Sequence, residues 1–224
     1  HYDDWKGEFY PEDLAQEDWL SFYAERFNTL EVNNTFYNIP EKKTLRHWKE
    51  QVPGHFRFTL KGSRYVTHMK KLKDAQEGMS NFYKAVEPLQ EKTKCILWQL
   101  PGNLHFNADK LEQLGKHASK HYINVVEFRH ESWFTDETFE LLEKYKLAYC
   151  MISAPEGLPE KATKTRPEAY LRFHGKDDWY KHNYTEAALK KWRQKLTGVK
   201  PTEVYIYFNN DYGANAIRNA QQLQ

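Results

Sequence analysis

The feature that most constrains this fold is a regular alternation of strand-like and helix-like segments along the chain. Segments with apolar residues at helical spacing, such as Met79, Phe82 and Val86, lie between short runs with the two-residue alternation or apolar content of β-strands. Strands that alternate with helices form a parallel sheet covered by helices. The sequence therefore predicts an α/β protein with strands at residues 29–34, 56–61, 95–100, 124–129, 148–152, 169–174 and 204–209.

Two arrangements of such a sheet compete, an open doubly wound sheet and a closed barrel. An open nucleotide-binding sheet would carry a glycine-rich phosphate loop, and neither G-x-G-x-x-G nor G-x-x-x-x-G-K-[ST] occurs. We therefore predict a TIM-type (β/α) barrel that forms a single domain over residues 1–224. Such a barrel has eight strands, so its first strand is expected to be missing or truncated before His1.

Side chains that can cap helices support these boundaries. Asp109, Thr135 and Thr185 each stand just before a helical pattern and are predicted N-caps. Leu189, Trp192 and Leu196 are expected to face inward from the helix that follows Thr185. A further helix is expected at residues 214–223.

Composition narrows the class of protein. The formal net charge of +2 gives no support to strong nonspecific binding of polyanions. Cys95 and Cys150 lie in apolar runs and are expected to be reduced core residues. No run approaches the ~20 apolar residues of a membrane span. We expect a cytoplasmic protein that does not associate with membranes, although the chain starts without Met and a removed leader stays an open alternative.

Polar side chains gather toward the C-terminal end of one face of the predicted strands. In residues 124–129, for example, Glu127 and Arg129 share a face opposite Val126 and Phe128. Active sites of barrels are built at this end of the strands. We therefore expect one polar site formed by Glu31, Asn33, Lys61, Gln99, Glu127, Arg129, Arg172, His174 and Asn209. The alternative is a structural network of ion pairs, in which Arg129 pairs with Glu31 or Glu127.

Three of these residues are candidate catalytic groups. His174 and His130 are the best acid–base candidates because imidazole titrates near neutrality, with His174 favoured, and His68 is a second choice. Glu127 can act as a base only if burial offsets the neighbouring arginines. Lys61 is a candidate electrophile or anion ligand.

The same region is expected to hold an anion rather than a metal. Arg129 and Arg172 can clamp a carboxylate or phosphate, and His130, Tyr37 and Trp133 are further candidate ligand-binding residues. Carboxylates and imidazoles are also present, but no H-E-x-x-H or similar metal-ligand spacing occurs and the cations would repel a metal ion. We predict no metal site and a metal-independent protein of unknown cofactor. The residues considered as possible metal ligands are Glu31, Glu127, His130, His174 and Asp211.

Several motifs together resemble the YecE-like domain-of-unknown-function family. They are YDDWKGEFYP at 2–11, FNTLEVNNTFY at 27–37, TLKGSRYVTH at 59–68, WQLPGN at 98–103, EFRHESWF at 127–134, YLRFHG at 170–175 and YFNND at 207–211. The resemblance implies a TIM-type barrel with a distant structural likeness to endonuclease IV and xylose isomerase. Members usually begin with a strand ending in a G-T-S-G-W-like segment, which is absent here, and many carry Asp where this chain has Ser153. The family implies no firmly assigned reaction.

Three functions stay open on the sequence. The first is an enzyme, a hydrolase or an isomerase, that binds a small anionic ligand such as a phosphorylated sugar or nucleotide. The second, by fold analogy alone, is a nucleic-acid-binding or nuclease-like protein. The third is a noncatalytic ligand sensor. The sequence indicates no oligomeric state.

Overall fold

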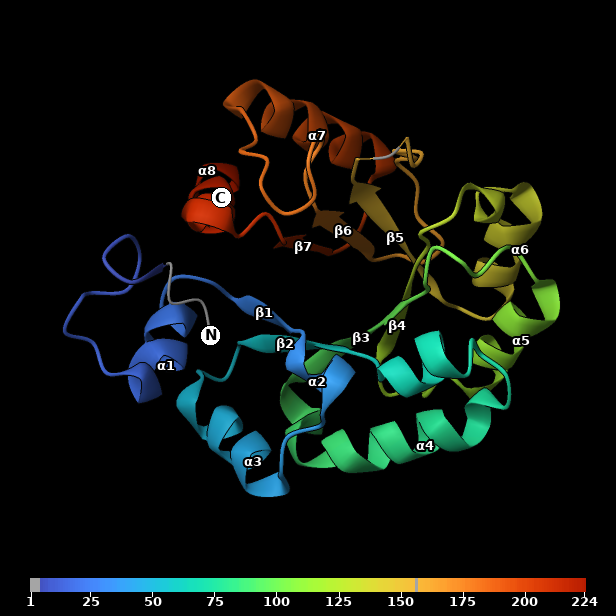
Figure 1. Cartoon of the computed structure of the whole chain (residues 1–224), viewed down its shortest axis with the longest axis horizontal. Helices are drawn as coiled ribbons and strands as arrows, with labels where there is room; N and C mark the ends of the chain where they lie inside the picture. The colour runs from blue at the N-terminus through green and yellow to red at the C-terminus, as the bar shows by residue number, and fades with distance from the viewer. Residues whose placement is uncertain (1–4, 156) are drawn as a thin grey trace. The chain divides into compact units, whose positions relative to one another are not determined.

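The computed structural model describes residues 5–155 and 157–224, so the start of the matched run at 2–11 and position 156 lie outside the described residues. Seven strands in these residues pair in parallel in their chain order, each with the next (Figure 1). The predicted parallel α/β arrangement is thus confirmed. The strands are β1 (Thr29–Val32), β2 (Arg57–Lys61), β3 (Thr93–Gln99), β4 (Ile123–Glu127), β5 (Ala148–Ser153), β6 (Ala169–Phe173) and β7 (Val204–Phe208).

Helices alternate with these strands. A π-helical turn, Tyr65–Met69, follows β2. No helix in the described parts of the chain is both long and apolar enough to cross a membrane. The helices are α1 (Trp19–Ala24), α2 (Asn34–Tyr37), α3 (Lys42–Gln51), α4 (Ala75–Val86), α5 (Ala108–His117), α6 (Asp136–Lys144), α7 (Glu186–Val199) and α8 (Asn215–Leu223).

The chain divides into two compact units, one of residues 20–149 and one of residues 1–19 with 150–224, here called the 20–149 unit and the terminal unit. Whether they form a single domain stays a prediction.

In the 20–149 unit, aromatic and aliphatic side chains of α4 pack against the sheet. Met79, Phe82 and Val86 of α4 are buried as the periodicity predicts. The Trp98 ring on β3 packs edge-on against Phe82, and its Nε1 donates to Oδ1 of Asn124 on β4 at 2.9 Å. Since side chains alternate along a strand, Gln99 and Glu127 point to the opposite face from Trp98 and Asn124.

In the terminal unit, stacked aromatic rings join the sheet to α7. Phe173 on β6 stacks on Phe208 on β7 at 4.6 Å and meets Trp192 on α7 edge-on. On the other face of β7, Tyr205 and Tyr207 are buried around Tyr170, whereas Val204 is exposed. The tyrosine face of β7 is therefore packed, because phenol rings bury large apolar areas while keeping a polar tip.

Most predicted boundaries hold, with two corrections. The strand predicted over residues 29–34 ends at Val32, and Asn34 already begins α2. Asp109 does not cap α5, because the cap is Asn107, whose side chain accepts from the Lys110 amide at 2.9 Å. The predicted caps Thr135 and Thr185 are confirmed, as is the inward face of α7.

Candidate functional site

The C-terminal strand ends of the 20–149 unit carry a buried ion pair. Gln99 on β3 is in register with Glu127 on β4, and Arg129 follows two residues later. Glu127 is fully buried, and its Oε1 accepts a hydrogen bond from Nε of Arg129. The sequence left this pairing open as the structural alternative, and it is confirmed. The ion pair engages one carboxylate oxygen of Glu127, and the role of Glu127 as a base stays a prediction.

Lys61 ends β2 beside an aromatic ring from α2. Its Nζ lies 4.4 Å from the centroid of Phe36, a cation–π distance. Its backbone carbonyl accepts from Oγ1 of buried Thr35 at 2.8 Å. The contact therefore ties the end of β2 to α2 and orients the Lys61 ammonium.

His68 shares this neighbourhood. Its ring lies edge-on to Phe36, and its Nδ1 is 2.9 Å from Oγ1 of Thr67. Partial burial, then Lys61, Arg64 and Arg129, lower the pKa of His68 to about 4. The imidazole is therefore neutral at pH 7, and three positive groups act on it. Sequence reasoning ranked His68 second and missed Arg64, although the SRYVTH run places both within one loop after a strand.

The backbone that carries His68 is unusual and tightly held. The turn Tyr65–Met69 is π-helical, closed by the Lys70 amide on the Tyr65 carbonyl at 2.8 Å, and such turns are frequent at functional sites. Lys71, Leu72 and Asp74 follow with φ of 47°, 63° and 50°, a region that costs non-glycine residues energy. Leu72 is buried and anchors the segment. The loop is thus a fixed feature of the unit.

The other residues expected in this unit lie at different depths. Glu31, Asn33 and Gln99 are half-buried, and Tyr37 is exposed. Trp133 is fully buried, stacks on Phe128 at 4.9 Å and donates from Nε1 to the Leu104 carbonyl, which is loop packing.

His130 joins two loops. Its ring stacks on that of His105 with centroids 3.9 Å apart. Its Nδ1 accepts from the Ser132 amide at 3.2 Å and lies 2.9 Å from Ser132 Oγ, which in turn accepts from the Phe106 amide. Because the amide must donate, neutral His130 carries its proton on Nε2. His105 and Ser132 were not singled out from the sequence.

The terminal unit brings three expected residues together, and all are buried. With the Asn209 amide oriented to satisfy its hydrogen bonds, its Oδ1 accepts from Nε and Nη2 of Arg172 at 3.2 and 2.8 Å. Nη1 of Arg172 donates to Nε2 of His174 at 3.4 Å. Since a guanidinium only donates, this Nε2 is unprotonated. His174 therefore presents its proton on Nδ1.

The loop after β6 encloses His174 with aromatic rings. Trp179 and Tyr180 lie 5.6 and 6.2 Å from it, centroid to centroid. Gly175 has φ of +121°, and a Cβ there would meet the Asp178 carbonyl oxygen at 2.0 Å, so only glycine fits. Its amide donates to the Tyr184 hydroxyl. The Ser153 hydroxyl donates to Glu160 at 2.8 Å.

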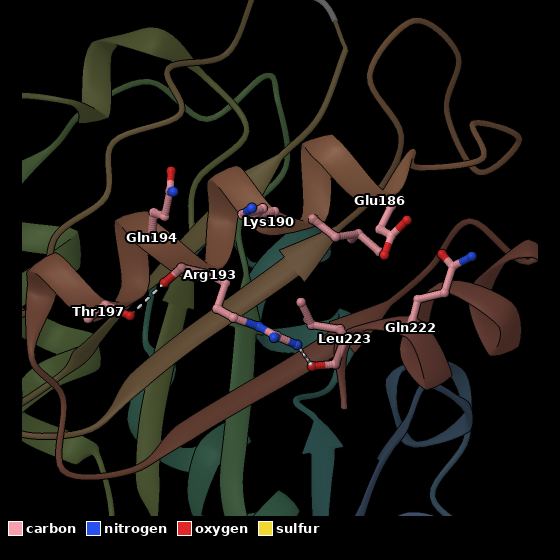
Figure 2. A pocket seen from close by; sticks show the side chains of 8 residues that line it. Glu186, Lys190, Arg193, Gln194, Thr197, Gln222 and Leu223 are labelled. Carbon is pink, nitrogen blue, oxygen red and sulfur yellow. Dashed lines mark hydrogen bonds between the residues drawn. The ribbon is translucent and has the colours of Figure 1, made fainter.

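A groove of about 430 Å³ lies between α7 and the end of α8 in the terminal unit (Figure 2). Figure 2 shows Arg193 pointing to the Leu223 carbonyl, which it reaches from Nη2 at 2.6 Å. None of the predicted site residues lines this groove. Its walls are Glu186, Leu189, Lys190, Arg193, Gln194, Thr197, Gln222 and Leu223.

Metal-ligating side chains do not gather in the described ranges 5–155 and 157–224, where no three His, Cys, Asp or Glu are grouped closely enough to hold an ion. Metal independence itself stays a prediction.

A family model described as "Protein of unknown function DUF72" matches residues 1–224. The chain belongs to the DUF72 family. This confirms the resemblance drawn from the motifs. The DUF72 chain is similar to the UPF0759 protein YunF of Bacillus subtilis, with 23% identity over 96% of this chain and 88% of that protein. It also matches the UPF0759 protein YecE of Escherichia coli K12, with 30% identity over 37% of this chain and 30% of that protein.

Solved structures agree. A DUF72 family protein from Thermotoga maritima superposes with a TM-score of 0.90 and 32% identity over 98% of this chain and 93% of that one. A xylose isomerase-like TIM barrel fused to a 4-hydroxyphenylpyruvate dioxygenase superposes with a TM-score of 0.55 and 13% identity over 92% of this chain and 40% of that one. The second likeness bears on the fold alone. The TIM-type fold class predicted for the DUF72 chain is thereby confirmed.

Proposed function

We propose that this DUF72 protein binds a small anionic ligand, of the class of phosphorylated sugars or nucleotides, at the C-terminal strand ends of its 20–149 unit. One observation carries the proposal. Lys61, Arg64 and Arg129 each lower the pKa of His68, so three cations lie close enough to one neutral imidazole to act on it electrostatically. A phosphate placed there would meet positive charge already in position, which limits the entropy lost on binding.

The three cations are expected to contribute unequally to binding of the anion. Arg129 is engaged by Glu127, which offsets part of its charge. Lys61 is oriented by Phe36 and Arg64 is exposed, so both can reach a ligand. We therefore assign the anion mainly to Lys61 and Arg64, with His68 as a neutral hydrogen-bonding neighbour.

His68 is also the group in this unit best suited to exchange a proton with the ligand. A negative charge beside an imidazole favours its protonated form, so a bound dianion would raise the pKa of His68 from about 4. Glu127 is less suited because its carboxylate is buried against Arg129. The acid–base role first expected of His174 stays a prediction for the terminal unit.

Titration calorimetry at low ionic strength tests the proposal. Inorganic phosphate and a sugar phosphate are titrated into the wild type, Lys61→Gln, Arg64→Gln and the control Lys84→Gln, which removes an exposed charge on α4. Each site variant should weaken binding about 10- to 150-fold, because a hydrogen bond to a charged group contributes about 1.5–3 kcal/mol. The control should match the wild type. Absence of binding to the wild type, or equal losses in all variants, would refute the proposal.

A second readout reports on His68 itself. The titration of its ring, followed by NMR, should move to higher pH when sulfate is added, because sulfate remains a dianion over this range. Lys84→Gln should show the same movement, and Lys61→Gln a smaller one. A His68 titration that sulfate leaves in place would show that no anion binds beside it.

A further inference from the structure

Three large exposed apolar side chains belong to the two segments that hold Phe36 and His68. Tyr37 is 68% exposed, Tyr65 47% and Met69 68%, and they account for half of the exposed large hydrophobic side chains in the described residues. All three belong to α2 or to the π-helical turn, the segments that follow β1 and β2. Single exposed apolar residues are ordinary, but a group beside a charged cluster indicates a contact surface.

These two segments are joined through Phe36. Phe36 meets His68 edge-on at 4.9 Å and is perpendicular to Tyr37, also at 4.9 Å. Phe36 is buried, so it fixes the base of this surface, whereas the Tyr37 ring is open to solvent. A flat aromatic ring therefore lies one buried neighbour away from His68 and Lys61.

Tyr65 is held differently. A Cβ on Gly78 of α4 would lie 3.4 Å from its ring, and Nζ of Lys70 lies 5.6 Å from its centroid. Tyr65 is thus braced between α4 and a cation. Tyr37 is the ring left open for a ligand, with the flexible Met69 side chain on the neighbouring segment.

We propose that the anionic ligand carries a nucleobase, as a nucleoside monophosphate does, and that the base stacks on Tyr37 while the phosphate meets Lys61 and Arg64. This inference rests on the proposed function of the same site. Aromatic rings interleaved with cations suit a ligand that has both a flat π-face and a negative group. A sugar phosphate has the charge but no such face, so it would leave Tyr37 unused.

The ligand is taken to be a free mononucleotide and not a strand. The net charge is only +2, and binding of a long polyanion depends on many phosphate contacts. The cations that act on His68 are three, of which Arg129 already pairs with Glu127. Three cations, one of them already in an ion pair, suit a ligand with a single phosphate group.

Calorimetry on the full chain tests the inference with adenosine monophosphate, ribose 5-phosphate and a single-stranded hexanucleotide. Adenosine monophosphate should bind about tenfold more tightly than ribose 5-phosphate. Tyr37→Ala should remove that advantage and leave ribose 5-phosphate binding unchanged, whereas Tyr37→Phe should keep it. Tyr212→Ala, at an exposed tyrosine of the terminal unit, is the matched control and should change neither.

The outcomes separate the inference from the proposed function. If neither phosphate compound binds the wild type, the proposed function itself is wrong. If both bind equally and Tyr37→Ala affects neither, the anion site stands and the nucleobase inference is overturned. A hexanucleotide that binds far more tightly than the mononucleotide, with steep salt dependence, would overturn the assignment to a free nucleotide.

Discussion

The imidazole of His68 lies edge-on against the ring of Phe36, with centroids 4.9 Å apart. The contact joins the loop after β2 to α2, which follows β1. It also holds a neutral imidazole where Lys61, Arg64 and Arg129 make a charged one unfavourable. His68 therefore contributes both to the packing between the two segments and to the pH dependence of the unit's stability.

Acidification should destabilise the fold through His68. Its pKa is about 4 in the folded chain, against about 6.5 for an unfolded one. Above pH 6.5 both states hold it neutral, and between pH 6.5 and 4 only the unfolded state takes up the proton, so the free energy of unfolding falls with falling pH. Because the ring is only partly buried, we expect a loss of about 1–2 kcal/mol, less than the full shift implies.

Urea unfolding at pH 7.5, 5.5 and 4.5 measures this effect. His68→Asn should show a flatter pH dependence than the wild type, and the exposed His121→Asn should follow the wild type. Parallel curves for His68→Asn and the wild type would contradict the prediction.

Gly62→Ala should destabilise the protein. A Cβ at this position would lie 2.3 Å from Cε3 of Trp98, and that ring is buried against Phe82 and tied to Asn124. Overpacking of this kind costs about 1–3 kcal/mol. Gly54→Ala is the control, since nothing lies within 4 Å of its added methyl group. Equal urea midpoints for the two variants would show that Trp98 can move aside.

The N-cap of α5 gives a direct comparison of two neighbouring residues. Asn107→Ala should cost about 1 kcal/mol because the Lys110 amide loses its acceptor. Asp109→Ala should cost only about 0.3–1 kcal/mol through the helix dipole. Thermal unfolding of both variants ranks them, and a larger loss for Asp109→Ala would reverse the assignment.

Asn209→Ala should destabilise the terminal unit. Arg172 is buried, and the substitution removes the acceptor of two of its N–H groups. Loss of hydrogen bonds to a buried charge costs about 2–3 kcal/mol. Asn209→Asp keeps an acceptor and should retain most of the stability. Lys43→Ala, which breaks an exposed pair with Glu41, should change little in the same chemical denaturation series.

The strand order and the helix faces followed from local spacing. Buried Met79, Phe82 and Val86 on α4 were predictable because helical periodicity places them on one side. The corrected cap of α5 depended on which of two nearby polar residues meets the Lys110 amide. That choice needs backbone dihedral angles, which spacing alone does not provide.

Parts of the expected arrangement are present, while the site itself stays a prediction. Lys61 and Glu127 end their strands, Arg129 follows two residues after β4, and Arg172 contacts both His174 and Asn209. Trp133 was predicted at a ligand surface but is buried, because the loop after β4 folds its ring onto Phe128. Arg64 was missed because no sequence pattern indicated the π-helical turn Tyr65–Met69. Arg64 immediately precedes this turn, which contains His68.

The sequence by itself determined the alternation of strands and helices, the face on which polar residues lie and the end of the strands they reach, because these depend on periods of two and 3.6 residues. Only the tertiary structure decided that Arg129 pairs with Glu127 and that three cations act electrostatically on His68. Those contacts depend on the loops that follow β2 and β4, whose paths are decided by packing and hydrogen bonding between residues distant in the chain.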